Sequence, residues 1–247
     1  MTHLHTTSTE TLNPIPADTN PTIVTPRGRR RPLVIAINGS ERPEGNNTIA
    51  LRHAQSVFAQ RGVDLEVIRL WDLNMTPCGP CGDCNFRTRP CEVRDDVAGV
   101  VDRMAEADGI IYATSVHGFG SSPKMPTFIE RSGTGYLRFN RRLTNKVAGI
   151  IVTGRRYSHT ETYGHLLHNV LLNRMLVAGY GFPAVLHGNE AGSILADEEG
   201  MEMLNRMIER MVDLMTVIRE HKEITGRDQL AVEVTSERDR APVAAAD

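Results

Sequence analysis

The sequence lacks several features that would place it in a specialised class of protein. No apolar stretch reaches the roughly 18 residues that a transmembrane helix needs, so we expect no membrane partner. The formal net charge is only -2 over 247 residues, which gives no general attraction to nucleic acid or acidic membranes. No signal peptide is visible, so we expect a soluble, cytoplasmic protein whose cysteines are not in disulfides.

The composition of the middle of the chain differs from that of its ends. Residues 1–31 are rich in Thr, Pro, Asn and Arg without apolar periodicity, and residues 226–247 are similarly polar. We expect a disordered leader at 1–31, one domain at 32–225 and a disordered tail at 226–247. The basic run that ends the leader is interpreted as a solvated tail, with contact to RNA or a protein as the alternative.

Apolar runs and helical patterns alternate through the domain. The apolar runs predict strands at 33–38, 65–70, 109–114, 147–152 and 182–187. Apolar residues at helical spacing predict helices at about 47–60, 95–107, 124–132, 160–179 and 197–222. Five strands each followed by a helix predict an α/β fold, a doubly wound five-stranded parallel sheet in a three-layer sandwich. Ligands of such sheets bind beyond the carboxyl ends of the strands, here in the order 2-1-3-4-5.

The first strand runs into a polar loop that opens a helix, Gly39-Ser-Glu-Arg-Pro-Glu-Gly-Asn-Asn-Thr48. Free backbone N–H groups and the positive helix end make such a point a phosphate site. The side-chain donors around it are Ser40, Arg42, Asn46, Asn47 and Thr48. Because neither G-x-G-x-x-G nor a Walker lysine is present, a phosphate monoester is favoured over a dinucleotide or triphosphate. An ordinary strand-to-helix loop with a good cap is the alternative.

All four cysteines lie within fourteen residues, as Cys78, Cys81, Cys84 and Cys91, in a loop at 77–95. This spacing favours a 4Fe-4S cluster, because three close thiolates can hold one face of the cube while the fourth closes the far corner. Structural zinc usually uses two separated CxxC pairs, so zinc and free redox thiols remain the alternatives. The loop follows the second strand and should therefore lie at the same edge as the phosphate loop.

The segment after the third strand reads Thr114-Ser-Val-His-Gly-Phe-Gly-Ser-Ser-Pro-Lys124. We expect a loop beside the phosphate loop, in which small residues let backbone amides approach a flat heterocycle. His117 and Phe119 offer ring contacts to the same ligand. A phosphate, a flat ring and the cysteines would thus share one edge of the sheet.

Together these residues resemble the NAD(P)H-dependent FMN reductase family of flavodoxin-like proteins, and within it the iron-sulfur flavoproteins. The likeness runs from about residue 33 to residue 188. It rests on three motifs, Gly39-Ser40-x-Arg42 with Asn47-Thr48, Cys91-x-x-x-Asp95-Asp96, and Lys124-x-x-x-Phe128-Ile-Glu-Arg131. The chain departs from the family pattern at Ser115-Val-His117, in place of Pro-x-Tyr, and at Thr153-Gly-Arg-Arg-Tyr-Ser-His159, in place of a glycine pair.

The resemblance implies noncovalent FMN, with its phosphate on the five donors of the first loop. Its ring would lie against Ser115, Val116, His117, Gly118 and Phe119. A further contact segment would be Thr153, Gly154 and Arg155. Arg155 and Arg156 are expected either to hold negative charge of the flavin or of a nicotinamide phosphate, or to be a solvated pair. The resemblance also implies a 4Fe-4S cluster on the four cysteines and a homodimer or homotetramer.

The function implied by the resemblance is that of an enzyme with NAD(P)H as co-substrate and a small electron acceptor such as a quinone or flavin. An electron carrier that exchanges electrons with ferredoxin-like proteins through the cluster is the alternative. A flavin-binding regulatory module with a structural metal is a third interpretation. We expect no catalytic acid or base, because the flavin carries the chemistry.

Overall fold

The computed structural model describes residues 30–79 and 90–227 of the chain. The strands are β1 (Leu33–Asn38), β2 (Asp64–Arg69), β3 (Gly109–His117), β4 (Gly120–Ser121), β5 (Val147–Gly154), β6 (Leu176–Val177) and β7 (Ala184–His187). The α-helices are α1 (Asn46–Gln60), α2 (Val97–Glu106), α3 (Lys124–Ser132), α4 (Arg138–Asn140), α5 (His159–Leu172) and α6 (Glu198–Thr225). A π-helical turn at Gly133–Leu137 joins α3 to α4, and short 3-10 turns lie at Leu70–Asp72 and Ser193–Ala196.

The sheet has the order β2-β1-β3-β5-β6, and its neighbours in this order are parallel. The predicted doubly wound order is confirmed, with its fifth position divided between two short strands. β6 pairs with the beginning of β5, and β7 pairs with the end of β5. The strand predicted at 182–187 is therefore β7 alone and begins two residues later than expected.

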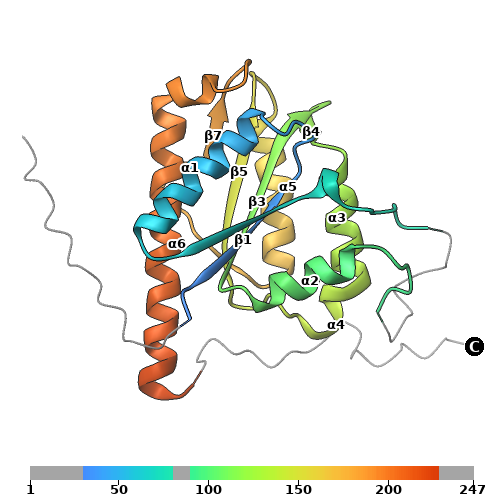
Figure 1. The fold of residues 1–247 in the computed structure, drawn as a ribbon, viewed down its shortest axis with the longest axis vertical. Coiled ribbons are helices and arrows are strands. Elements are labelled where there is room, and N and C mark those ends of the chain that lie inside the picture. Colours follow the sequence, from blue (N-terminus) through green and yellow to red (C-terminus); the bar gives the residue numbers. More distant parts are fainter. Residues whose placement is uncertain (1–29, 80–89, 228–247) are drawn as a thin grey trace, which may run out of the picture. The chain divides into compact units, whose positions relative to one another are not determined.

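Helices cover both faces of the sheet (Figure 1). On one face α1 and α6 pack against Val34 and Ala36 of β1, and on the other α2, α3 and α5 pack with Ile35 and Ile37. Successive side chains of a strand point to opposite faces, so a strand buried on both faces must be apolar throughout. The continuous apolar run of the first strand has this cause, and the predicted three-layer sandwich is confirmed.

The helix predicted at 160–179 is wrong beyond Leu172. The N–H of Met175 donates to the carbonyl of Val170, 3.2 Å away, which is the long hydrogen bond of a Schellman motif. Arg174 occupies the left-handed position of that motif, with φ of 55°. Because an arginine stands where glycine is usual, the sequence gives no sign of the helix end, and its apolar pattern continues into β6.

The loop predicted after the third strand is a β-hairpin. β3 continues to His117, turns at Gly118 and Phe119, and returns antiparallel as β4. Both turn residues have positive φ, 52° and 68°, as in the tight turns that match the twist of a hairpin. The expected ring-contacting residues are therefore held by cross-strand pairing.

Several expected segments fall outside the described residues. These are residues 1–29 of the leader, 80–89 of the cysteine loop and 228–247 of the tail, so the domain boundaries stay predictions. Within the part that the structure describes, none of the helices combines the length and apolar character that a membrane crossing requires.

Candidate functional site

The carboxyl ends of β1, β3, β5 and β7 meet at one edge of the sheet. A cavity of about 230 Å³ opens there. It is lined by residues of four loops, Ser40, Arg42, Gly45, Asn46, Asn47, Ser115, Val116, His117, Thr153, Gly154, Arg155, Gly188 and Asn189. The loops come together because parallel pairing aligns the strand ends that carry them.

A buried amide shapes the first of these loops. The Oδ1 atom of Asn38 accepts hydrogen bonds from the backbone N–H of Ser40, at 2.9 Å, and from the side chain of Asn47, at 2.7 Å. Its Nδ2 atom donates to the hydroxyl of Thr48, at 3.3 Å. Asn38 is completely buried and so fixes the end of β1 against the beginning of α1. Asn38 was not among the predicted site residues, although a polar side chain at the end of an apolar strand is a usable signal.

The amino end of α1 faces the cavity with free donors. The cap is Gly45, whose missing side chain leaves the N–H groups of the first turn uncovered, and that turn holds no acidic residue. A Cβ on Gly45 would lie only 2.9 Å from the Cβ of Arg42. Positive helix end, uncovered N–H groups and the Arg42 guanidinium together make an anion site.

Two polar atoms of the cavity wall have no partner within the described residues. They are the Oδ1 atom of Asn47 and the hydroxyl of Ser115, and both are buried. A buried polar atom without a partner is costly unless a ligand satisfies it. A ligand with one phosphate and several hydroxyl groups fits this wall, because the helix end takes the phosphate and these two atoms take hydroxyls. FMN has this composition in its ribityl phosphate.

Ser122 joins the first loop to the hairpin. Its hydroxyl donates to the carbonyl of Gly39, at 2.6 Å, and lies 2.9 Å from the hydroxyl of Thr114. A Cβ on Gly39 would lie 2.7 Å from that Ser122 oxygen, so only glycine allows this approach. The two walls of the cavity are thus fixed relative to each other.

A second cavity, of about 360 Å³, adjoins the first at the hairpin. Its lining is Val116, Gly118, Phe119, Arg155, Arg156 and Tyr157. Phe119 and Tyr157 are 75% and 65% exposed. The lining of this cavity therefore offers two aromatic faces and two guanidinium groups, and none of its lining residues carries a carboxylate. This arrangement suits a flat ring system and an anionic group beside it.

The cysteine segment is anchored at both described ends by one buried ion pair. Arg131 and Asp95 have side chains only 2% and 1% exposed, with Nη1 and Oδ2 2.7 Å apart. The same guanidinium donates to the carbonyl of Thr76, and its Nη2 atom lies 4.0 Å from the sulfur of Cys91. Cys91 is also held by its N–H, which donates to the carbonyl of Gly135 at 2.9 Å. We call the Arg131–Asp95 pair with its Thr76 contacts the clasp.

The clasp favours the ionised form of Asp95. Burial raises the pKa of this carboxyl, but hydrogen bonds from Arg131 and from the N–H groups of Thr76 and Val97 outweigh burial and lower its pKa below the ordinary value. Of the predicted metal ligands, Cys78 and Cys91 are described, and Cys81 and Cys84 lie outside the described residues. In residues 30–79 and 90–227 no three metal-ligating side chains gather. The surroundings of Cys91 fit a group bound by thiolates, because the Arg131 guanidinium lies beside its sulfur.

The sequence model of the NADPH-dependent FMN reductase family matches residues 32–190, which carry β1 to β7 and all of the lining described above. The chain belongs to this family. It is accordingly an NAD(P)H-dependent FMN oxidoreductase with a flavodoxin-like fold.

The chain is also similar to named proteins and to a solved structure. The chain is 33% identical over 193 residues to a protein of Methanocaldococcus jannaschii named an iron-sulfur flavoprotein, covering 75% of this chain and 98% of the other. A protein of Methanosarcina thermophila with the same name is 25% identical, with 77% and 98% covered. The solved flavoenzyme NAD(P)H:(acceptor) oxidoreductase of Paracoccus denitrificans shares the fold, with a TM-score of 0.55, 16% identity and 75% and 98% covered.

The predicted FMN contacts of this FMN reductase can be compared with the cavities. All of them line the first cavity except Thr48, Gly118 and Phe119. Gly118 and Phe119 line the adjoining one, and Thr48 instead binds within the first loop. Gly188 and Asn189, after β7, also line the cavity and were not predicted. They follow a short strand and match no motif.

Proposed function

We propose that the protein holds FMN along this edge and passes electrons from NAD(P)H to a small acceptor such as a quinone or a free flavin. The observation that carries the proposal is the first cavity, where an uncovered helix end meets two unpartnered buried polar atoms. Family membership supports the cofactor and the electron donor.

In this proposal each wall has a part in holding FMN. Arg42, Ser40 and the first turn of α1 bind the phosphate, while Asn47 and Ser115 bind ribityl hydroxyls. The hairpin and the segment Thr153–Arg155 hold the flavin ring in one orientation. When bound, FMN would accept hydride from a nicotinamide and pass on one or two electrons.

The phosphate assignment is tested with Arg42→Ala. Loss of a charge-assisted hydrogen bond, about 1.5–3 kcal/mol, should weaken FMN binding about 10- to 150-fold. The measurement is titration of apoprotein with FMN, followed by quenching of flavin fluorescence. Arg52→Ala is the matched control, because Arg52 lies on α1 but pairs with Glu44 at the surface. Equal FMN affinity in the wild-type protein and Arg42→Ala would remove Arg42 from the site.

We further propose that Cys78, Cys81, Cys84 and Cys91 bind a 4Fe-4S cluster. The spacing, the relatives named iron-sulfur flavoproteins and the clasp beside Cys91 support it. With the cluster, the second candidate function is an electron carrier that exchanges electrons with ferredoxin-like proteins. The spectrum of anaerobically purified protein before and after dithionite is the test. Flavin bands plus a broad bleachable absorption support the cluster, and flavin bands alone leave the cysteines as thiols.

We also propose a cytoplasmic homodimer or homotetramer. Apolar side chains exposed on the described surface support self-association, among them Leu171, Leu172, Tyr180 and Phe182. Light scattering of the purified holoprotein tests this, and a monomer at micromolar concentration would contradict it.

A further inference from the structure

A histidine and a glutamate from two walls of the first cavity approach each other. His117 ends β3 and lines the cavity, and its Nδ1 atom lies 3.8 Å from Oε1 of Glu41, which belongs to the loop after β1. Pairing of His117 with Gly120 in the hairpin fixes its backbone. The two side chains are 33% and 40% exposed, so solvent protons reach the pair. Because Glu41 lies at Nδ1, it favours one orientation of the imidazole and leaves Nε2 for another partner.

The charged residues that line the first cavity are basic. They are Arg42 and Arg155, and the lining contains no aspartate or glutamate. A guanidinium stays charged at every physiological pH, whereas an imidazole gains or loses its charge between about pH 5 and pH 8. His117 is therefore the group of this lining whose charge changes near neutral pH.

The sequence has a titratable group where a neutral one is usual. Proteins of the FMN reductase family often have Pro-x-Tyr where this chain has Ser115-Val-His117. A tyrosine hydroxyl with the ordinary pKa of about 10 is neutral at pH 7. A protonated imidazole in its place adds a positive charge to the wall against which the flavin ring is expected to lie. Such a fixed cation stabilises negative charge that develops beside it.

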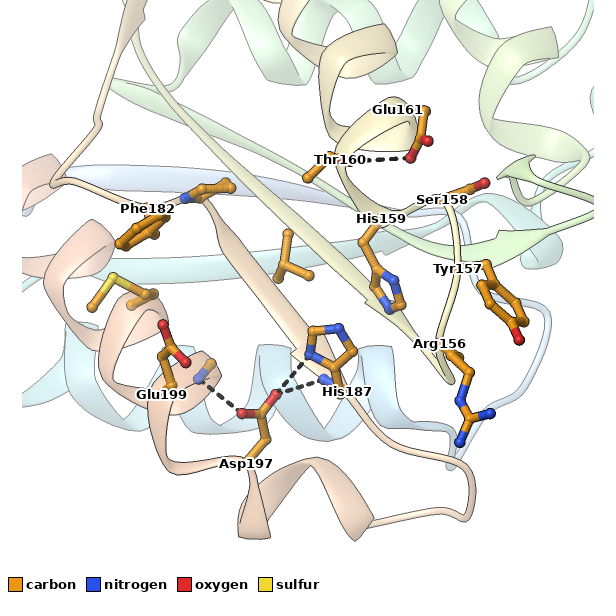
Figure 2. A pocket seen from close by; sticks show the side chains of 14 residues that line it. Arg156, Tyr157, Ser158, His159, Thr160, Glu161, Phe182, His187, Asp197 and Glu199 are labelled. Carbon is orange, nitrogen blue, oxygen red and sulfur yellow. Dashed lines mark hydrogen bonds and ion pairs between the residues drawn. The ribbon is translucent and has the colours of Figure 1, made fainter.

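Two other imidazoles lie near the first cavity. α5 packs against β3 and β4, and its first turn holds His159 and Glu161. Both line a third cavity, of about 440 Å³, together with His187 and Asp197 (Figure 2). The His159 ring lies beside His187 and against Gly154, where a Cβ would lie 2.7 Å from its Nε2 atom. Burial lowers the pKa of His159, which favours its neutral form. Neither His159 nor Glu161 lines the first cavity, whereas His117 does.

We propose that His117, oriented by Glu41, contacts the flavin ring and in its protonated form favours binding of reduced FMN over oxidised FMN. Hydride transfer from NAD(P)H adds two electrons and one proton to the ring, so the ring gains one negative charge. His117 balances this charge with a proton taken from solvent, which raises the midpoint potential of the bound flavin. This inference rests on the proposed function and deepens it, because it makes the reducing power of the protein depend on pH through one side chain.

The test measures the midpoint potential of FMN bound to the purified protein at pH 7, by reductive titration against a reference dye. His117→Gln keeps a polar side chain but cannot carry the charge. It should weaken binding of reduced relative to oxidised FMN about 5- to 10-fold, which corresponds to a midpoint about 20–30 mV lower. The affinity for oxidised FMN, from titration of apoprotein, should stay within about twofold of wild type. His168→Gln is the matched control, because His168 is exposed on α5 and lines none of these cavities.

A pH series and two further variants test the role of the charge. The difference in midpoint between wild type and His117→Gln should shrink from pH 7 to pH 9, because the imidazole is then neutral. His117→Arg, which keeps its charge, should hold the raised midpoint at pH 9. Glu41→Gln should move the change in midpoint to lower pH, since a neutral amide no longer favours the charged imidazole. Titration of His159 and His187 is common to wild type and His117→Gln and cancels in the difference.

The outcomes separate this inference from the proposed function. Tight FMN binding with equal midpoints in wild type and His117→Gln overturns the role of His117 and leaves the proposed function standing. A midpoint difference that stays constant between pH 7 and pH 9 also overturns it, because a purely structural effect does not titrate. Equal loss of affinity for oxidised and reduced FMN contradicts it as well, since His117 then only holds the cofactor. A wild-type protein that binds no FMN overturns both proposals.

Discussion

Replacing Asp95 by asparagine should destabilise the protein strongly, because it removes one partner of the buried ion pair in the clasp. The carboxylate of Asp95 accepts hydrogen bonds from Nη1 and Nη2 of Arg131 and from the N–H groups of Thr76 and Val97. Both charged side chains are almost completely buried. Leaving the Arg131 charge buried and unpaired costs about 3–5 kcal/mol. The amide of asparagine keeps the volume, so the loss measures charge and hydrogen bonding rather than a cavity.

The difference in free energy of unfolding between the wild-type protein and Asp95→Asn is measured by urea unfolding of the purified proteins at pH 7, from the shift in the urea midpoint. The control is Asp102→Asn, because the pair of Asp102 with Arg142 is exposed. Exposed pairs contribute about 0–1 kcal/mol, so the control should be near wild type. Replacing Arg131 by methionine together with Asp95→Asn should recover part of the loss, since no charge is then left unpaired. A loss for Asp95→Asn no larger than that of the control would refute the reasoning.

The lowered pKa of Asp95 determines how the stability difference between the wild-type protein and Asp95→Asn changes with pH. The pKa of Asp95 is lower in the folded protein than in the unfolded chain, so ionised Asp95 stabilises the fold above the ordinary carboxyl pKa. This contribution is lost as pH falls through the folded-state pKa. The stability difference between wild type and Asp95→Asn should therefore shrink below about pH 4. A constant difference from pH 7 to pH 3 would show that the charge does not produce it.

Two further predictions concern the hairpin. Phe119→Gly should raise the free energy of unfolding by about 1 kcal/mol, because glycine adopts the left-handed φ of 68° without strain and Phe119 buries little surface. The measurement is the midpoint temperature of thermal unfolding, and a lowered midpoint would contradict the prediction. Ser122→Ala should cost about 0.5–1.5 kcal/mol in urea unfolding, because it removes one of the two hydrogen bonds to the Gly39 carbonyl and leaves the one from Trp71 Nε1. Ser56→Ala, at an exposed hydroxyl, is the control expected to change little.

The sequence allowed the strand order and the sheet edge to be predicted because both follow from short-range patterns. The apolar run at 33–38 and the loop after it indicate a buried parallel strand that opens a helix, whatever the rest of the chain does. The end of α5 could not be predicted, because Arg174 takes a backbone conformation that the residue type disfavours. Packing of the following apolar residues in β6 offsets that cost.

The candidate site was predictable where side chains carry a charge or lie next to a motif. Arg42 and Asn47 are of this kind. Gly188 and Asn189 are not, because they reach the cavity through the pairing of β7 with β5 and no local pattern marks them. The hairpin at Phe119 was missed for a related reason, since its two left-handed turn residues are Gly-Phe rather than the usual Asn-Gly.

The clasp also has a thermodynamic consequence for whatever the cysteines bind. Arg131 holds Thr76 and Cys91 close to each other through contacts that do not involve a ligand. The conformational entropy of bringing these two chain positions together is therefore lost when the domain folds, not when a ligand arrives. The affinity of a group bound by Cys78 and Cys91 therefore depends on the fold of the domain, which already holds Thr76 and Cys91 in place.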